Sequence, residues 1–302
     1  MSTLVRPRKP LLALMMSLFL PGFGQLYNGE PNRAIWLFLG YCGLTAVGAA
    51  FVALYVPSGL TMAVLLVGLC LTVGLWIYGM VDAWKAAKRQ PDFMPRAWQT
   101  SGLYLLVAIV CVFIAQPVFS SYIRDHEVES FRDPSSSMEP TLMRGDFIFA
   151  DKRYNCPNCK EAVERGDIAI FTYPNDRTVY YVKRIVGLPG ERVQIKGYDV
   201  LINGRSLGIG ASQTSDGQQV VEGDGHRQWR VIWSKRDEPS ADIDTTVPAG
   251  QVFVLGDNRN LSVDSRSIGT VPLQDVVGRV RQVWFSYADG RVRWARMGRV
   301  IA

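Results

Sequence analysis

A serine run at residues 134–141 (PSSSMEPT) directly follows the last long apolar segment and contains the first candidate nucleophiles. Ser and Pro are ordinary loop formers, so the run by itself favours a turn. A hydrolytic serine also needs a base that accepts its proton. The chain has only two histidines, His126 and His226, and both lie in polar settings typical of solvated surface residues. A serine-histidine triad is therefore not indicated.

Lys183 is the best candidate for a base other than histidine. It lies in residues 179–186 (VYYVKRIV), where strand alternation places Tyr181, Lys183 and Ile185 on one face and Arg184 on the other. That face is apolar apart from the lysine, and burial disfavours a charged ammonium. The alternative is an edge-strand lysine with a solvated amine. This segment alone leaves both readings open.

Residues 256–266 (GDNRNLSVDSR) form a third polar segment, directly after an apolar run at 252–255 that is typical of a buried strand. Alone, the segment is compatible with a solvated turn. It is also compatible with a divalent-cation loop, because Asp257, Asn258 and Asp264 supply hard oxygens. The alternating ligands and terminal Glu of an EF-hand are missing from it.

Taken together and in this order, the three segments resemble those of bacterial type I signal peptidases, membrane-anchored serine proteases with a Ser/Lys dyad. The family's serine followed by Met-x-Pro-Thr matches residues 137–141, and its lysine segment matches residues 181–191. Its late loop, G-D-N-x-x-x-S-x-D-S-R, matches residues 256–266. The resemblance implies an endopeptidase, without metal or cofactor, that removes N-terminal signal peptides from exported preproteins after a small-x-small motif.

The resemblance also implies roles for individual residues. Ser137 would be the nucleophile and Lys183 the general base. The backbone N–H of Ser137 and the hydroxyl of Ser135 would form an oxyanion hole, whose preorganised donors stabilise developing negative charge. Ser262 would orient the Lys183 amine by a hydrogen bond. A supporting ion pair is expected in the late loop, between Asp264 and Arg266.

The substrate would bind as an extended strand whose side chains alternate into shallow apolar pockets. By position, Phe131 and Val182 are candidate pocket walls. Met138 and Tyr181 are expected to exclude water from the lysine. Asp133 stands where the family usually has an apolar residue, which leaves the nature of the outer pocket open.

The elements before this site form an apolar, basic half of the chain. Residues 1–123 hold 8 Lys+Arg and 3 Asp+Glu, whereas residues 124–302 hold 25 and 24, so the net charge of +6 lies mainly among apolar segments. Binding of nucleic acid would need a basic patch on a folded domain and is not expected. Three apolar runs reach the roughly 20 residues that a membrane-spanning helix needs; they cover residues 34–56, 60–84 and 103–123.

A shorter apolar run at 11–20 predicts a re-entrant or interfacial helix. Ionisable residues inside the three spans would indicate a channel or transporter, but only Asp82 occurs, at the end of the second. Lys85, Lys88, Arg89 and Arg96 lie in the loop after that span. By the positive-inside rule this loop is cytoplasmic.

The resulting topology is a multi-pass protein of the bacterial inner membrane, with the catalytic domain on the periplasmic side. The expected partners are signal-peptide-bearing preproteins and the lipid bilayer. The family has one or two anchoring helices. The extra spans therefore either strengthen the membrane anchor or bind a partner, and the translocation machinery is a candidate for that partner.

The fold expected is a multi-span α-helical membrane domain, residues 1–123, followed by a mainly antiparallel β catalytic domain, residues 124–302. Short β-branched and aromatic runs separated by Gly, Pro, Asn and Asp predict its strands; they lie at 147–150, 168–173, 179–186, 192–195, 228–233, 252–255 and 276–285. A Gly-rich stretch at about 197–250 predicts an inserted β-ribbon or small β subdomain.

Two questions stay open at this level. Cys156 and Cys159 could form a disulfide, bind a metal with a partner chain, or remain free thiols. The motifs also fit a dedicated peptidase that matures one conjugation or pilin protein. A catalytically silent membrane scaffold is disfavoured, because a scaffold has no need of Ser137, Lys183 and Ser262 together.

Overall fold

The computed structural model describes residues 7–56, 60–155, 162–213, 217–234 and 242–300. The chain divides into two compact units, Met1–Val56 with Met62–Arg124, and Pro57–Thr61 with Asp125–Ala302. The first unit is helical and the second consists mainly of β-strands. Cys156 and Cys159 lie outside the described residues, so the alternatives for this pair stay open.

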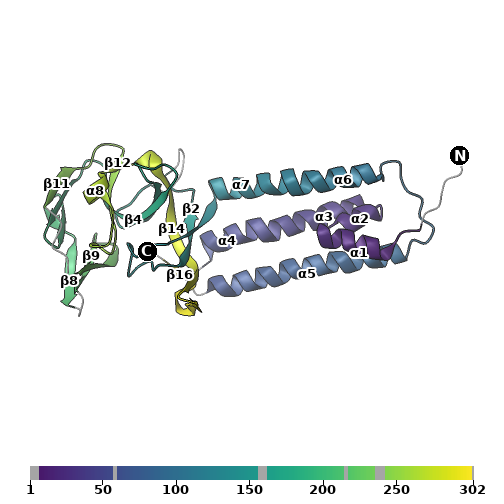
Figure 1. Ribbon diagram of the computed structural model, residues 1–302, viewed down its shortest axis with the longest axis horizontal. Coiled ribbons are helices and arrows are strands. Elements are labelled where there is room, and N and C mark those ends of the chain that lie inside the picture. Colours follow the sequence, from purple (N-terminus) through teal and green to yellow (C-terminus); the bar gives the residue numbers. More distant parts are fainter. Residues whose placement is uncertain (1–6, 57–59, 156–161, 214–216, 235–241, 301–302) are drawn as a thin grey trace. The chain divides into compact units, whose positions relative to one another are not determined.

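The helical unit contains three segments that are long and apolar enough to cross a membrane: Pro31–Tyr55, Thr61–Lys88 and Ser101–His126. They contain most of each predicted span. The first segment runs through α3 and α4 and the third through α6 and α7 (Figure 1), and each includes a short π-helical stretch, η1 or η3. The helical elements are α1 (Pro10–Phe19), α2 (Phe23–Tyr27), α3 (Pro31–Cys42), η1 (Gly43–Val47), α4 (Gly48–Tyr55), α5 (Thr61–Lys88), α6 (Ser101–Ile109), η3 (Val110–Ala115) and α7 (Gln116–His126).

Local sequence signals explain where these helices begin and end. Helices α1 and α3 start with Pro10 and Pro31, whose missing N–H is not needed in a first helical turn. The hydroxyl of Thr100 accepts a hydrogen bond from the backbone N–H of Leu103 and caps α6. Between α1 and α2, Gly22 has a φ of 88°, a left-handed conformation that glycine adopts at little cost.

Small residues let the short helices approach α5 closely. Ala13 of α1 packs in one buried cluster with Ala83 and Ala87 of α5. A Cβ added to Gly24 would collide with the backbone of Ala13, so only glycine fits that position of α2. The backbone N–H of Gly24 also donates to the hydroxyl of Ser17, at 3.0 Å. The ten-residue helix predicted here is present, while its re-entrant or interfacial placement stays a prediction.

The β unit is built on one antiparallel sheet with the strand order β1-β2-β14-β3-β4-β12-β13, and β15 and β16 also pair with β14 (Figure 1). Strand β4 lies between β3 and β12; β3 pairs with its residues 180–184 and β12 with its residues 184–187. The strands of this sheet are β1 (Val128–Arg132), β2 (Asp146–Asp151), β3 (Ile168–Thr172), β4 (Tyr180–Gly187), β12 (Gln251–Leu255), β13 (Val271–Pro272), β14 (Val276–Ala288), β15 (Arg291–Val292) and β16 (Arg299–Val300).

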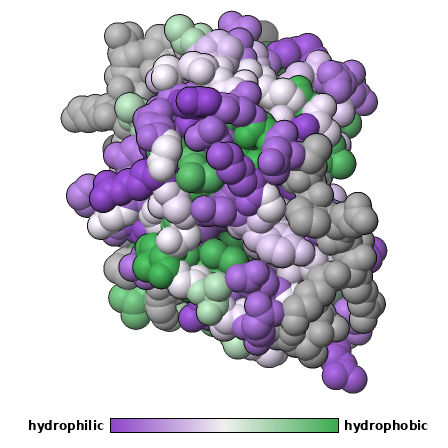
Figure 2. Space-filling view, turned by 90° about the vertical axis from the view of Figure 1, so that its left-hand side faces the viewer, coloured by the Kyte–Doolittle hydropathy of each residue, from purple (hydrophilic) through white to green (hydrophobic). Residues whose placement is uncertain are grey.

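Two smaller sheets are formed mainly by the chain between β4 and β12. One has the order β10-β9-β8 and the other β11-β5-β6-β7. Figure 2 shows one face of the molecule, on the side where Figure 1 places β8 and β11, as mainly hydrophilic with separate hydrophobic patches. The strands are β5 (Arg192–Lys196), β6 (Asp199–Ile202), β7 (Arg205–Ser206), β8 (Gly208–Gln213), β9 (Gly217–Gly223), β10 (Gln228–Ser234) and β11 (Ile243–Thr246).

All seven predicted strands are confirmed, with ends that differ by no more than three residues. The mainly antiparallel β fold that follows the apolar helices is also confirmed. Alternation accounts for the agreement: along β10, the side chains of Trp229, Val231 and Trp233 are buried while those between them are more exposed. The apolar period of two marks a half-buried strand even when neighbouring loops are irregular.

The sheet of β8–β10 is tied to the loop that follows β12. Arg259 of that loop is 1% exposed, and its guanidinium lies 2.5 Å from the carboxylate of Glu222 in β9. The indole N–H of Trp229 donates to the same carboxylate at 3.0 Å. The backbone N–H of Ile232 donates to the carbonyl of Asp257, and the N–H of Arg259 donates to that of Ile232. The smaller sheet thus fixes the backbone of the late loop.

We expect Glu222→Gln to lower the free energy of unfolding by about 3–5 kcal/mol, because it leaves the buried guanidinium of Arg259 without a counter-ion. Chemical denaturation of the detergent-solubilised full chain measures the change. The matched control is Asp244→Asn, which breaks an exposed ion pair with Arg192 and should have little effect. Equal, small effects of the two substitutions would contradict a structural role of the buried pair.

Candidate active site

The side chains of Ser137 and Lys183 meet inside the β unit. Ser137 lies in the connection between β1 and β2, Lys183 lies in β4, and the Lys183 Nζ to Ser137 Oγ distance is 2.8 Å. Both residues are buried, with 6% and 4% exposure. The neighbouring Met138 is fully buried in the core formed by β2, β3 and β14, which anchors the backbone of the serine. The structure thus brings the predicted nucleophile and base into hydrogen-bond contact.

Burial sets the electrostatics of the lysine. Desolvation lowers the pKa of Lys183 below its ordinary value of about 10.5, and it outweighs the attraction from the carboxylates of Asp264, Asp133 and Asp257. The ring of Tyr181 lies 5.3 Å from Nζ and covers one side of the amine. An amine with a lowered pKa holds its neutral, proton-accepting form at a lower pH than a solvated lysine does. The predicted buried lysine is therefore confirmed over the solvated alternative.

A line of hydrogen bonds continues from the serine to Ser135 and Asp133. The hydroxyls of Ser135 and Ser137 lie 3.0 Å apart, and the N–H of Ser137 donates weakly to Ser135 Oγ at 3.4 Å. The backbone N–H and the hydroxyl of Ser135 both donate to Asp133 Oδ1, at 3.0 and 3.1 Å. The two donors predicted for the oxyanion hole are thus next to each other.

The late loop packs directly against the nucleophile. The N–H of Asn258 donates to the carbonyl of Ser137 at 3.0 Å. A Cβ added to Gly256 would lie 2.6 Å from that carbonyl oxygen and closer still to Ser262 Oγ. Real Cβ atoms essentially never come within 3.0 Å of such neighbours. Sequence reasoning did not single out Gly256, although its place at the start of the polar loop was the available signal.

The predicted hydrogen bond between Ser262 and Lys183 is not present in the structure. The hydroxyl of Ser262 is buried without a hydrogen-bond partner among the described residues, and Lys183 Nζ donates instead to Ser137 Oγ and to the carbonyl of Val182. The physical reason is packing, since the Ser262 side chain fills the space that the missing Cβ of Gly256 leaves.

Two ion pairs hold the segments of the site together. Asp264 and Arg266 form the pair expected in the late loop, with Nε to Oδ1 at 2.8 Å. A second pair was missed: Arg184, 1% exposed, binds both carboxylate oxygens of Asp257 at 2.8 and 2.7 Å. The hydroxyl of Thr141 donates to the same carboxylate at 2.5 Å. All three matched segments therefore meet at Asp257. Hydrogen-bond donors thus occupy both oxygens of the Asp257 carboxylate.

A pocket of about 450 Å³ opens beside the two central residues. Phe131 and Val182, the predicted pocket walls, both line it, as does Asp133. The remaining lining residues are Arg132, Pro134, Ser135, Ser137, Val179, Tyr180, Tyr181, Lys183, Leu261 and Val263. An extended peptide placed here would lie directly against Ser137.

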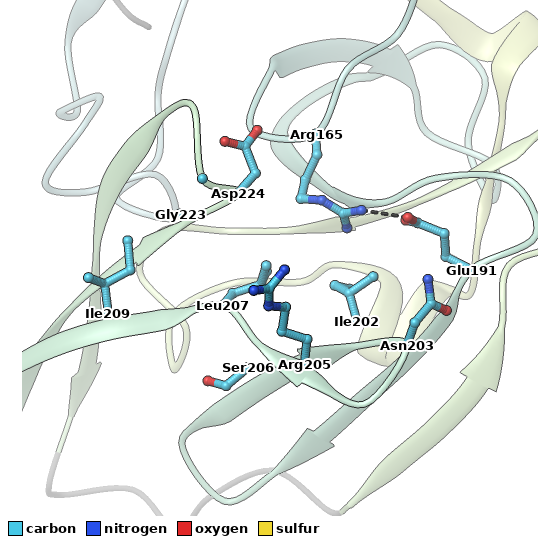
Figure 3. Close-up of a pocket in the computed structure, with 11 residues that line it drawn as sticks. Arg165, Glu191, Ile202, Asn203, Arg205, Ser206, Leu207, Ile209, Gly223 and Asp224 are labelled. Carbon is cyan, nitrogen blue, oxygen red and sulfur yellow. Dashed lines mark hydrogen bonds and ion pairs between the residues drawn. The ribbon is translucent and has the colours of Figure 1, made fainter.

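A second, larger pocket of about 560 Å³ lies among β6, β7 and the turn after β9 (Figure 3). Figure 3 shows the guanidinium of Arg165 pointing to Glu191, an ion pair of 2.5 Å. Among the described residues that line this pocket, Ser206 is the one with a hydroxyl and none is a lysine or histidine; the Ser206 hydroxyl donates to Asp199 at 2.5 Å. Size therefore does not identify the reactive site; the smaller pocket holds the paired serine and lysine.

Comparisons with known proteins identify the family of the chain. A sequence model described as "Signal peptidase, peptidase S26" matches residues 101–285, more than half of the chain. The chain belongs to the signal peptidase S26 family. It is 35% identical over 198 residues to a signal peptidase I of Pseudomonas fluorescens, covering 56% of this chain and 69% of the relative. A Pseudomonas aeruginosa signal peptidase I is 34% identical, with the same coverage.

A solved signal peptidase I from Enterococcus faecalis is 30% identical, and the alignment covers 39% of this chain and 97% of that one, with a TM-score of 0.29. The S26 signal peptidases are serine endopeptidases that cleave signal peptides from preproteins, which is also the activity of this protein. Its apolar helices agree with association with a membrane. The two histidines are exposed, as predicted.

We expect Gly256→Ala to reduce preprotein cleavage by about a hundredfold or more, because an added methyl group forces Ser262 and the backbone of Ser137 apart and misplaces the nucleophile. Cleavage of a purified preprotein measures the effect. Gly210→Ala is the control, since a Cβ at that position of β8 meets no atom within 4 Å. Full activity of Gly256→Ala would contradict the tight packing of the late loop on the serine.

Proposed function

We propose that this signal peptidase cleaves exported preproteins after a small-x-small motif, with Ser137 as nucleophile and Lys183 as general base. The observation that carries the proposal is the 2.8 Å contact between the Lys183 amine and the hydroxyl of a buried serine. Nucleophile and base within hydrogen-bond reach are the signature of covalent catalysis by a serine. Of the described residues, the two histidines are exposed and lie outside the lining of this pocket, so they do not compete for the role.

In the proposed reaction, neutral Lys183 takes the proton of Ser137 as the Oγ attacks the scissile carbonyl carbon. The tetrahedral intermediate then collapses, the C–N bond breaks, and the amine of the mature protein leaves with the proton from Lys183. Water attacks the resulting ester with Lys183 again as base, which releases the signal peptide and restores Ser137.

The backbone N–H of Ser137 and the hydroxyl of Ser135 are proposed to stabilise the oxyanion. The 3.4 Å distance between the Ser137 N and Ser135 Oγ supports the proposal because the two donors are close together, and the Ser135 hydroxyl would turn from Asp133 Oδ1 to the oxyanion when substrate binds. Asp264 and Arg266 are proposed to hold the late loop. For Ser262 we propose support by packing against Gly256, in place of the hydrogen bond to Lys183.

The preprotein is proposed to bind as an extended strand along the 450 Å³ pocket, with Phe131 and Val182 as walls. Met138 and Tyr181 keep water from the lysine, which is supported by the complete burial of Met138 and the ring of Tyr181 over the amine. Shallow walls of this kind favour small side chains before the cleaved bond.

For the membrane half we propose three crossings, with residues 1–123 as the membrane domain and residues 124–302 as the catalytic domain on the periplasmic side of the bacterial inner membrane. Lys85 and Lys88 in the last turn of α5 support a cytoplasmic position of the loop that follows. The bilayer is then a partner, and the extra helices are available to the translocation machinery. Residues 197–250 are proposed as the inserted β subdomain.

Ser137→Ala and Lys183→Met are each expected to lower preprotein cleavage by at least a thousandfold while the protein stays folded, because one removes the nucleophile and the other the base. Lys196→Met, at an exposed end of β5, is the control and should retain activity. Cleavage is followed with purified full-length protein, and folding by thermal melting. A Lys183→Met protein that cleaves at the normal rate would rule out the dyad.

Cleavage should rise with pH through a pKa below 10.5, because only the neutral amine of Lys183 accepts the serine proton. The same shift affects stability. Between the lowered pKa and the ordinary one, the unfolded chain binds more protons than the folded chain, so the free energy of unfolding increases with pH in that window. Lys183→Met should remove this dependence. A rate profile that follows an ordinary lysine would show that the amine is solvated.

A further inference from the structure

Asp133 is a buried acid in the wall of the peptidase pocket, at a position where an apolar residue was expected. It is 3% exposed. Its backbone is held on both sides, because its N–H donates to the carbonyl of Asp146 and its carbonyl accepts from the N–H of Gly145, at 2.9 and 2.8 Å. The backbone position from which the Asp133 side chain extends is therefore fixed, in the same pocket as Ser135 and Ser137.

The two oxygens of this carboxylate differ in their hydrogen bonding. Oδ1 accepts from both the N–H and the hydroxyl of Ser135, which occupies its two lone pairs. Oδ2 is buried and has no hydrogen-bond partner among the described residues. A further donor can therefore be accepted only at Oδ2.

An unpaired carboxylate oxygen in a buried place is energetically costly. The charged groups that act on Asp133 are Lys183, which stabilises its anion, and Asp146, which opposes it. Burial is the largest effect and raises the pKa of Asp133, against the hydrogen bonds from Ser135. A donor that reached Oδ2 would relieve this cost.

Apart from the proposed catalytic groups of Ser135, Ser137 and Lys183, the side chains that line the pocket around Asp133 offer such a donor few partners. Val179, Val182, Leu261 and Val263 line it with aliphatic groups. A small apolar side chain in the pocket would contact these walls and leave Oδ2 unpaired. A hydroxyl-bearing side chain of the same size would contact the same walls, and a turn of the Asp133 side chain would bring Oδ2, which is buried in the free protein, to the pocket surface to pair with it.

We propose that Asp133 determines specificity, and that the protein prefers preproteins with Ser or Thr over Ala or Val at the position whose side chain enters the pocket beside Ser135. The inference rests on the proposed cleavage by Ser137 and Lys183. Sites with a buried polar group reject ligands that lack its partner much more strongly than apolar pockets reject an added hydroxyl. The substrate class is therefore narrower than small residues in general.

A purified preprotein tests this when the residues before its cleaved bond are changed one at a time among Ala, Ser, Val and Thr. Thr and Val have the same shape, so their ratio isolates the hydroxyl. With the wild-type protein we expect kcat/KM for Thr over Val, and for Ser over Ala, of about tenfold or more at one position. Near-equal values at every position would overturn the inference.

Asp133→Leu should bring the kcat/KM ratios of Thr over Val and of Ser over Ala to about one or below. This holds whatever the effect on the overall rate, because general damage to the site lowers both values of a ratio equally. Asp133→Ala serves the same purpose if the larger side chain prevents folding, which thermal melting detects. Val263→Ala is the matched control, since it enlarges the same pocket and leaves Oδ2 in place, and it should keep the preference. A preference that persists in both Asp133 variants would also overturn the inference.

The outcomes separate this inference from the proposed function. Failure of the wild-type protein to cleave any of the preproteins contradicts the function itself. Cleavage of all of them without a hydroxyl preference leaves the Ser/Lys mechanism intact and removes only the role of Asp133.

Discussion

An amine can serve as a base near neutral pH only where its surroundings disfavour the ammonium ion, and the β unit supplies such surroundings for Lys183. Lys183 lies in β4 opposite Ala169 of β3, and only 4% of its surface is exposed. The ring of Tyr181 covers one side of the amine. The cost of burying this amine falls on the folded state, and the rest of the unit must supply the stability that offsets it.

Buried ion pairs keep the neighbouring segments in place around that amine. Arg184 and Asp257 join β4 to the late loop, and Thr141 adds the segment of the nucleophile to the same carboxylate. Arg259 and Glu222 extend the support to the β8–β10 sheet. Buried pairs of this kind contribute little net stability compared with apolar packing, but each charged group demands its partner and so permits only one arrangement. Their value here is geometric, since catalysis depends on sub-ångström placement of a serine and an amine.

The serine segment shows how one departure from the family's usual residues affects a site without altering its central pair. Asp133 leaves Ser137 and Lys183 in contact, yet it engages the hydroxyl that is proposed to stabilise the oxyanion. Its other carboxylate oxygen is buried without a hydrogen-bond partner among the described residues, beside a pocket that is otherwise mostly apolar. Under the proposed roles, activity and selectivity would depend on different atoms of the same short segment, and one could vary while the other is retained.

Local sequence patterns were enough for the strands and the apolar helices, whereas the proposed dyad followed from the resemblance of three motifs to those of signal peptidases. Alternation marks half-buried strands such as β10. The motif around Ser137 was informative because its residues occur in the same order as in the family that it resembles. Patterns along the chain could not show that Arg184 is buried against Asp257. Nor could they show that the missing side chain of Gly256 leaves space for Ser262, or that Ser262 makes no hydrogen bond to Lys183. Arg184 and Asp257 are 73 residues apart in the chain, and Lys183 and Ser262 are 79 residues apart, so only the folded packing decides which of them meet.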